Sequence, residues 1–309
     1  IMIFSIDSMY ENMLLYYITF GIVLGNILFP SWFFQGIEKM KYITIITVTS
    51  RIIFTILIFI IVREEDDFIF VPLFNSIGSI IGGVIALRIV FKNHDVNIYI
   101  PNKHVIIQQL NDSFYFFVSR VANNGSRYLS TTIIGAFFGY TTVGYYTLIE
   151  KIFYAFTSIG GLVSQSIFPY MSRTKDIYTF KKILLFSIVI MFPIILALMF
   201  FNESLLLLVF DMKNEMLSNI FIIVFSGAMF SIISSIIGYP LLAAFGYPKY
   251  ANNSLIYASL VYIGYILIAV TISKNIYYVS FSIVVYMLTA LLIRLYYIKK
   301  TSLLKGHNY

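Results

Sequence analysis

Apolar stretches long enough to cross a lipid bilayer recur along almost the whole of this chain. A transmembrane helix needs about 20 apolar residues to span roughly 30 Å of hydrocarbon. We predict about nine complete helices, at 12–31, 42–62, 68–91, 110–138, 142–170, 183–210, 217–241, 253–272 and 277–297. Residues 1–5 are expected to be the end of a helix already under way. The pattern indicates an all-α, polytopic integral membrane protein.

Composition excludes a soluble globular protein. The 309 residues are 60% hydrophobic and 11% charged, whereas soluble domains are about 45–50% apolar and 25% charged. The net charge of +7 is not gathered into a basic cluster, so we expect no nucleic-acid partner. With no cysteine, no metal-ligand spacing of the three histidines and no nucleotide-binding glycine loop, we predict no metal, no cofactor and no enzyme activity.

The basic residues predict the orientation of the helices, because loops rich in Lys and Arg stay in the cytoplasm. Of the basic residues assigned to loops, 14 lie in one alternating set of loops and 3 in the other. The richer set includes the C-terminal segment, which predicts a cytoplasmic C-terminus. The richer set is Lys39, Lys41, Arg88, Lys92, Lys103, Arg173, Lys175, Lys181, Lys182, Lys249, Arg294, Lys299, Lys300 and Lys305. The poorer set is Arg63, Lys213 and Lys274, and it lies with the acidic run at 64–67.

Two short stretches are more distinctive than composition. Residues 30–44 read "PSWFFQGIEKMKYIT", a cytoplasmic turn in which Trp32, Phe33 and Phe34 are expected to lie at headgroup depth. Residues 143–173 read "VGYYTLIEKIFYAFTSIGGLVSQSIFPYMSR". The first strongly resembles the turn after the fourth helix of Wzx-type O-antigen flippases, in the polysaccharide-export MOP/MATE superfamily. The second resembles the eighth helix of that family.

The resemblance implies a fold, a substrate and partners. Family members have twelve helices in two bundles, so this chain would begin at the end of helix three. Residues 1–103 would form a partial N-terminal bundle, residues 104–309 a six-helix bundle, and 92–109 the hinge. The implied activity moves undecaprenyl-pyrophosphate-linked repeat units from the cytoplasmic to the periplasmic leaflet of the bacterial inner membrane. Membrane lipids, a polysaccharide polymerase and a chain-length regulator are the implied partners.

Charged residues inside the predicted helices are the candidate substrate contacts. They are Arg51, Arg120, Arg127, Lys151 and the single acid Glu150. An arginine at bilayer mid-depth costs roughly 2.5–3.5 kcal/mol unless it faces protein or water. The positive excess therefore predicts a wet cavity with an anionic ligand. For Arg120, snorkelling to the cytoplasm or pairing with Asp112 is the structural alternative.

Helical spacing groups these charges with other polar residues. Steps of three and four place Gln109, Ser113, Arg120, Asn124, Arg127 and Thr131 on one face. Thr47 shares a face with Arg51, and Tyr154 shares one with Glu150. Asn123, Asn124, Thr47, Tyr154 and Glu150 are the polar or coupling candidates. The glycine-rich run at 77–83 instead indicates close helix packing.

Two other functions are compatible with a chain of this kind. An integral-membrane O-antigen polymerase or glycosyltransferase would need a long extramembrane loop, and the predicted loops are short. A multidrug exporter of the same superfamily would favour an acidic cavity for cationic drugs, whereas this one is basic.

Overall fold

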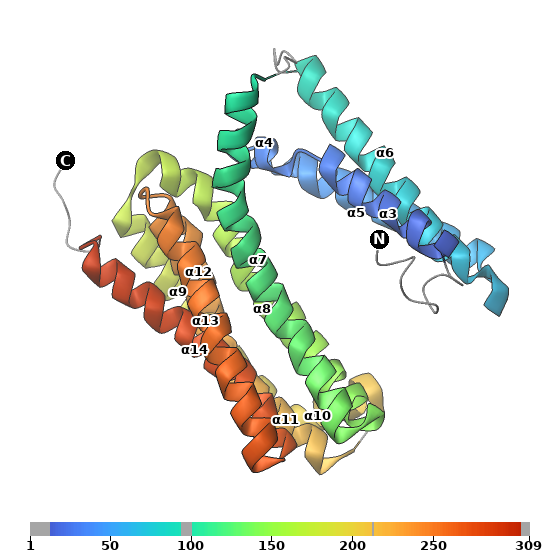
Figure 1. Cartoon of the computed structure of the whole chain (residues 1–309), viewed down its shortest axis with the longest axis vertical. Coiled ribbons are helices and arrows are strands. Elements are labelled where there is room, and N and C mark those ends of the chain that lie inside the picture. The colour runs from blue at the N-terminus through green and yellow to red at the C-terminus, as the bar shows by residue number, and fades with distance from the viewer. Residues whose placement is uncertain (1–12, 94–100, 212, 304–309) are drawn as a thin grey trace. The chain divides into compact units, whose positions relative to one another are not determined.

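The computed structural model describes residues 13–93, 101–211 and 213–303, and these residues form helices without any strand. The chain divides into two compact units between Ile100 and Pro101, where the sequence predicted a boundary between residues 103 and 104. The predicted stub at 1–5 lies outside the described residues, and so does the middle of the predicted hinge, at 94–100. The helices of each unit are labelled in Figure 1.

The N-terminal unit consists of long apolar helices joined by short turns. Its elements are α3 (Met13–Leu28), α4 (Ser31–Gly36), α5 (Lys41–Ile61), the 3-10 turn η1 (Glu65–Ile69) and α6 (Phe70–Asn93). Within η1, the Asp67 carboxylate accepts the backbone N–H of Arg63 at 2.9 Å and that of Glu64 at 3.1 Å. These bonds end α5 and lead the chain into α6.

Helices α3 and α6 approach so closely that only glycine fits at the contact. A Cβ on Gly25 would lie 2.4 Å from the backbone carbon of Ser79, and one on Gly83 would lie 2.7 Å from Cβ of Leu28. Small residues let membrane helices pack backbone against backbone, where no hydrophobic effect drives association. The packing role predicted for the glycine-rich run at 77–83 is therefore confirmed.

The aromatic turn of the N-terminal unit is only partly an interface belt. Trp32 is 74% exposed, as expected for a headgroup anchor, but Phe34 is fully buried. The Phe34 ring lies 5.5 Å from the ring of Tyr42 and 6.5 Å from that of Phe29. Phe34 is therefore not part of an exposed aromatic belt, because α4 turns this ring into the small core of the unit, and its depth in the membrane stays a prediction.

The C-terminal unit is larger and has an extensive aromatic core. Its elements are α7 (Lys103–Phe138), α8 (Tyr140–Thr174), α9 (Ile177–Phe200), α10 (Asn202–Phe210), α11 (Glu215–Ser226), α12 (Ala228–Ile237), the π-helical turn η2 (Gly238–Ala243), α13 (Pro248–Ile268), the π-helical turn η3 (Ala269–Ser273) and α14 (Ile276–Lys300). Phe153, Phe221 and Phe225 are among its fully buried rings. Helices α7 and α8 run alongside each other (Figure 1).

Seven helical segments of the described chain are long and apolar enough to cross a membrane. They match seven of the nine predicted spans. The other two are α7 and α8, which are 36 and 35 residues long, so length does not exclude them. Their polar side chains lower the apolarity, and these are the helices that carry most of the candidate site.

Two predicted boundaries are corrected. The predicted join at 92–109 is shorter, because α6 continues to Asn93 and α7 begins at Lys103. The single span predicted at 183–210 is interrupted between α9 and α10. At this break the Asn202 side chain donates to the Met199 carbonyl at 2.7 Å and accepts from the Ser218 hydroxyl at 2.5 Å. The Asn202 side chain thus caps the last turn of α9 through the Met199 carbonyl and ties the break to α11 through Ser218.

Candidate functional site

Helix α7 presents a polar face that is distinct from its packing face. The buried residues of α7 include Ser119, Ser126 and Ser130, and two of these serines bond a carbonyl of their own helix. Arg120 and Asn124 are exposed and Arg127 is half-buried. The small serines let α7 pack closely, while the longer polar side chains are left on the adjacent face.

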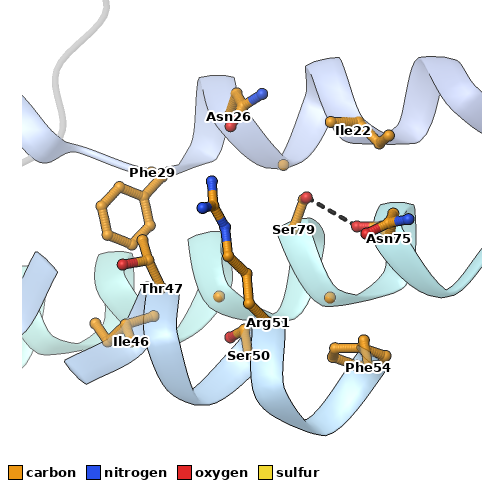
Figure 2. Close-up of a pocket in the computed structure, with 13 residues that line it drawn as sticks. Ile22, Asn26, Phe29, Ile46, Thr47, Ser50, Arg51, Phe54, Asn75 and Ser79 are labelled. Atoms are coloured by element: carbon orange, nitrogen blue, oxygen red, sulfur yellow. Dashed lines mark hydrogen bonds between the residues drawn. The ribbon is translucent and has the colours of Figure 1, made fainter. Parts of the chain in front are cut away.

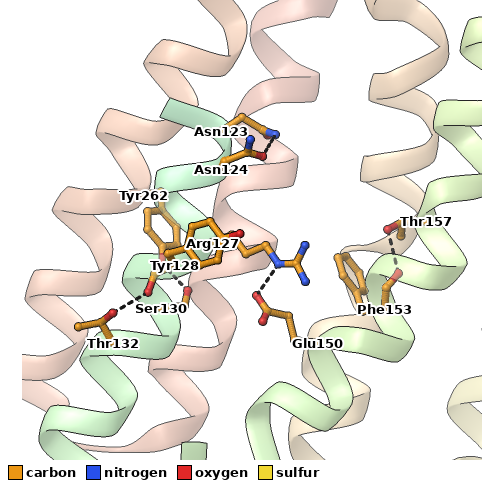
Figure 3. A network of polar contacts seen from close by, with 10 residues as sticks. All are labelled: Asn123, Asn124, Arg127, Tyr128, Ser130, Thr132, Glu150, Phe153, Thr157 and Tyr262. Carbon is orange, nitrogen blue, oxygen red and sulfur yellow. Dashed lines mark hydrogen bonds and ion pairs between the residues drawn. The ribbon is translucent and has the colours of Figure 1, made fainter. Parts of the chain in front are cut away.

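Arg127 extends toward Glu150 of α8 (Figure 3), and the Tyr154 ring of the same helix faces its guanidinium. Its Nε is 3.6 Å from Oε1 of Glu150, and its guanidinium is centred 4.0 Å from the Tyr154 ring. Glu150 is 5% exposed, whereas the Arg127 side chain is 39% exposed. Glu150 and Tyr154 are four residues apart, so one face of α8 supplies both contacts. The positive charge of Arg127 is thus partly compensated while one side of the guanidinium stays open.

The two candidate asparagines connect α7 to α14. The Tyr286 hydroxyl donates to Oδ1 of Asn123 at 2.6 Å, and the Asn123 amide reaches Oδ1 of Asn124 at 3.5 Å. Deeper in the unit, Ser130 and Tyr262 share a buried hydroxyl–hydroxyl hydrogen bond. The rings of Tyr262 and Tyr286 meet edge to face at 6.3 Å. Sequence reasoning missed both tyrosines, because they come from helices far along the chain.

Arg120 lies one level away from Arg127 along α7. Its guanidinium is 5.7 Å from the centre of the Tyr239 ring, which belongs to η2. Beside it, Asn252 accepts from Ser119 at 3.0 Å and from the Tyr239 hydroxyl at 2.7 Å through Oδ1. Asp112 forms no ion pair with Arg120 in the described part of the chain, so the predicted structural alternative of pairing does not occur here.

Arg294 corrects the sequence interpretation. We predicted it in a cytoplasmic loop, but it is 5% exposed in α14. Its Nε donates to Ser254 at 2.8 Å, and Nη1 donates to the hydroxyl of Ser234 at 3.0 Å and to the Ser234 carbonyl. A basic residue one or two turns from a helix end is typical of a loop boundary, which is why the pattern misled. Ser234 and Ser254, which lie in two other apolar helices, were the only sequence hint that a buried polar side chain needs partners there.

Lys151 does not join the Arg127–Glu150 pair. It is exposed, whereas its neighbour Glu150 is buried, because adjacent residues of a helix point in different directions. Among the residues that the structure describes, no acid lies within ion-pair distance of Lys151. It therefore leaves its charge on the exposed surface of α8, and its contact with a substrate stays a prediction.

Arg51 lines a separate cavity inside the N-terminal unit, of about 270 Å³. Figure 2 shows its guanidinium extending toward Asn26 of α3, with Thr47, Ser50 and Ser79 around it. The Thr47 hydroxyl already donates to the Ile43 carbonyl at 2.7 Å. Within the described residues, the Arg51 guanidinium has no acidic partner. This cavity offers a cation and several small polar groups in otherwise apolar helices.

The described residues contain no group of three or more His, Asp or Glu side chains that could hold a metal ion. The groups brought together are guanidinium, amide, hydroxyl and aromatic, with one carboxylate, that of Glu150. These suit an oxygen-rich ligand that carries negative charge, since guanidinium binds phosphate oxygens in pairs and amides and hydroxyls bind sugar hydroxyls.

Comparison with known proteins identifies the family. The model of the family described as "Polysaccharide biosynthesis protein" matches residues 1–175. The chain belongs to this family. The resemblance to the O-antigen flippases, which was drawn from residues 30–44 and 143–173, is thereby confirmed.

Two relatives are both named "Putative O-antigen transporter". The one from Escherichia coli (strain K12) is 29% identical over 163 residues, which are 53% of this chain and 39% of that protein. The one from Shigella dysenteriae is 27% identical over 164 residues, which are 53% of this chain and 41% of that protein. The match thus spans about two fifths of the length of these relatives.

Solved structures confirm the fold class. One is an outward-facing multidrug resistance MATE family transporter of the MOP superfamily, with a TM-score of 0.61 and 12% identity over 77% of this chain and 57% of that one. Another is a MATE protein in a bent conformation, with a TM-score of 0.60 and 12% identity over 76% of this chain and 57% of that one. The chain therefore has the MATE-like helical fold of a multi-pass membrane protein.

Proposed function

We propose that this protein translocates undecaprenyl-pyrophosphate-linked repeat units of a surface polysaccharide from the cytoplasmic to the periplasmic leaflet of the bacterial inner membrane. The observation that carries the proposal is the Arg127–Glu150–Tyr154 cluster with its neighbouring asparagines, in helices of a polysaccharide biosynthesis family. An oxygen-rich ligand with a charged group would satisfy such a cluster, and a lipid-linked oligosaccharide has both parts. The named relatives support this choice of substrate class.

The chemistry of the site matches the two polar parts of that substrate. Arginines without an acidic partner would bind the pyrophosphate, because their planar donors fit phosphate oxygens bidentately. Asn123, Asn124 and Tyr154 would face the sugars, and the apolar helix surfaces would remain in contact with the lipid tail. Since no ATP-binding motif is present in the sequence, an ion or substrate gradient would drive transport. A polymerase and a chain-length regulator would act on the product.

The alternatives have less support. A polymerase or glycosyltransferase needs an extended catalytic loop, and the helices of the described chain follow one another closely. The solved MATE neighbours include a multidrug transporter, but that likeness concerns the fold. A cationic drug would be repelled by the arginines of the two units.

Deletion of the gene followed by complementation tests the proposal. Loss of the protein should remove surface polysaccharide and accumulate sugar-loaded carrier lipid in the cytoplasmic leaflet. If repeat units reached the outer leaflet but stayed unpolymerised, the polymerase alternative would replace the proposal.

Orientation has its own test. A reporter fused after Tyr309 should be active only in the cytoplasm, and one inserted at 64–67 only in the periplasm. The reverse result would overturn the proposed orientation without affecting the proposed substrate.

A further inference from the structure

The two arginine levels of α7 differ in how their charge is compensated. Arg127 has Glu150 at 3.6 Å. Arg120 is seven residues earlier in the sequence, which is roughly 10 Å along a helix axis. In the described part of the chain, no acid lies within ion-pair distance of Arg120. Its guanidinium instead faces the Tyr239 ring, 5.7 Å from the ring centre. The two levels therefore present different charges to a ligand.

A second, buried cation stands behind Arg120. Arg294 is 5% exposed and its hydrogen bonds go to neutral oxygens, those of Ser234, Ser254 and Ala251. Its guanidinium lies against Gly238, where a built Cβ would be 2.7 Å from Nη1, and the next residue, Tyr239, is the ring that faces Arg120 at 5.7 Å. Among the described residues, no carboxylate lies within ion-pair distance of Arg120 or Arg294. Two like charges near one tyrosine repel each other and are costly in a low-dielectric interior. A negative group at this level would relieve that repulsion.

An unsatisfied donor lies at the same level. Asn252 is 1% exposed, and its Oδ1 is occupied by Ser119 and Tyr239. Its amide nitrogen has no hydrogen-bond partner among the residues that the structure describes. A buried donor without an acceptor costs about 1–3 kcal/mol. Among the described residues, the level thus combines an exposed guanidinium with no acidic partner, a buried amide donor without an acceptor, and a buried positive charge.

We infer that Arg120, Tyr239 and Asn252 form the subsite for a phosphate-type anion, with Arg294 as the buried positioning charge behind it. The Arg127–Glu150 level is then the neutral one, which takes hydroxyl-bearing groups. The identification of this anion with the diphosphate of a carrier lipid rests on the proposed function. An anionic phospholipid headgroup carries the same phosphate chemistry and is the other possible source.

Calorimetric titration of the purified chain in phosphatidylcholine nanodiscs tests the subsite. The probe is geranyl diphosphate, and geraniol is the uncharged reference. Arg120→Gln should weaken diphosphate binding about tenfold or more, the usual loss for a charged hydrogen bond. Lys182→Gln is the matched control, because Lys182 also lies over a tyrosine ring, at 4.5 Å from Tyr178, and it should leave the affinity unchanged. Arg127→Gln should change it by less than about threefold, since its charge is already compensated.

The role of the Arg294 charge is tested by comparing a variant that keeps the charge with one that removes it. Arg294→Lys should keep the diphosphate affinity within about threefold, whereas Arg294→Met should lower both the affinity and its dependence on salt. Thermal unfolding of each variant separates these effects from misfolding. Equal weakening by Arg294→Lys and Arg294→Met would show a purely structural arginine and overturn its assigned role.

The source of the anion is decided by replacing phosphatidylcholine with phosphatidylglycerol. If phosphatidylglycerol weakens geranyl diphosphate binding to the wild type but not to Arg120→Gln, the subsite is assigned to phospholipid headgroups. If the wild type binds geranyl diphosphate equally well in both lipids, the subsite is assigned to the carrier diphosphate. No binding of geranyl diphosphate, or binding that depends on Arg127 and not on Arg120, would overturn the inference. Because repeat-unit translocation is measured separately in cells, its loss with intact Arg120-dependent binding would reject the proposed function alone.

Discussion

The two units of this protein keep their helices together by different means. In the N-terminal unit, α3 and α6 meet backbone to backbone, with Gly25 against Ser79. In the C-terminal unit, aromatic rings fill the core, and polar side chains link helices that are far apart in sequence. There, Gly238 faces the guanidinium of Arg294, whose Nη1 would lie 2.7 Å from a built Cβ. A backbone cannot yield to an added methyl group, but the end of a side chain can, so the two units should respond differently to the same substitution.

Gly25→Ala should give the largest effect, a loss of about 3 kcal/mol in unfolding free energy, because the new Cβ meets backbone atoms and α3 must move away from α6. Denaturant unfolding in detergent measures it. Gly264→Ala, at a position with open space around the built Cβ, is the control and should be neutral or slightly stabilising. Equal stability of both variants would show that the close approach of α3 and α6 does not hold the unit.

Arg127→Met should cost about 2 kcal/mol, because Glu150 is left buried without its cation; breaking a fully buried pair costs more, and Arg127 is half-exposed. The double variant Arg127→Met/Glu150→Gln should recover most of this loss. The four proteins of this cycle, compared by denaturant unfolding, give the coupling energy of the pair. A coupling energy near zero would contradict a stabilising role for the ion pair.

Gly238→Ala should destabilise by about 1 kcal/mol, less than Gly25→Ala, because the Arg294 guanidinium can shift to admit the methyl group. The same unfolding assay in detergent ranks the two variants. If Gly238→Ala proved the more damaging, the contrast between a backbone contact and a side-chain contact would be wrong.

Asp176 should give the smallest effect, and one that depends on pH. Its carboxylate accepts the N–H groups of Tyr178 and Thr179 at the start of α9, and these bonds together with the Thr179 hydroxyl lower its pKa below the usual 3.8. A lowered pKa means that the stabilisation is present above pH 3.8 and is lost as pH falls through the folded-state value. The stability difference between the wild type and Asp176→Ala should therefore be constant near neutral pH and shrink only in strong acid. A difference that shrinks near pH 6 would implicate another group.

Sequence reasoning found what depends on neighbours along one helix. A charge inside an apolar run is visible directly, so Arg51, Arg127 and Glu150 were identified, and the four-residue spacing placed Tyr154 beside Glu150. The contacts of Tyr239 with Arg120, of Asn252 with Ser119 and of Tyr286 with Asn123 join helices separated by more than a hundred residues in sequence, and nothing in a single helix predicts them. Arg294 was misassigned because position near a helix end was taken as exposure. The break at Phe201 was missed although Asn202, Glu203 and Ser204 follow it, because these three polar residues are flanked by long apolar runs on both sides.

The polarity of α7 also has a consequence for biogenesis. Each arginine at mid-membrane depth opposes insertion of an isolated helix by roughly 2.5–3.5 kcal/mol on translocon scales, and α7 carries Arg120 and Arg127. Newly made α7 should thus remain at the insertion machinery until α8 emerges and Glu150 can meet Arg127. The two helices are then expected to partition into the lipid together, as a hairpin, after the more apolar helices that precede them have already entered.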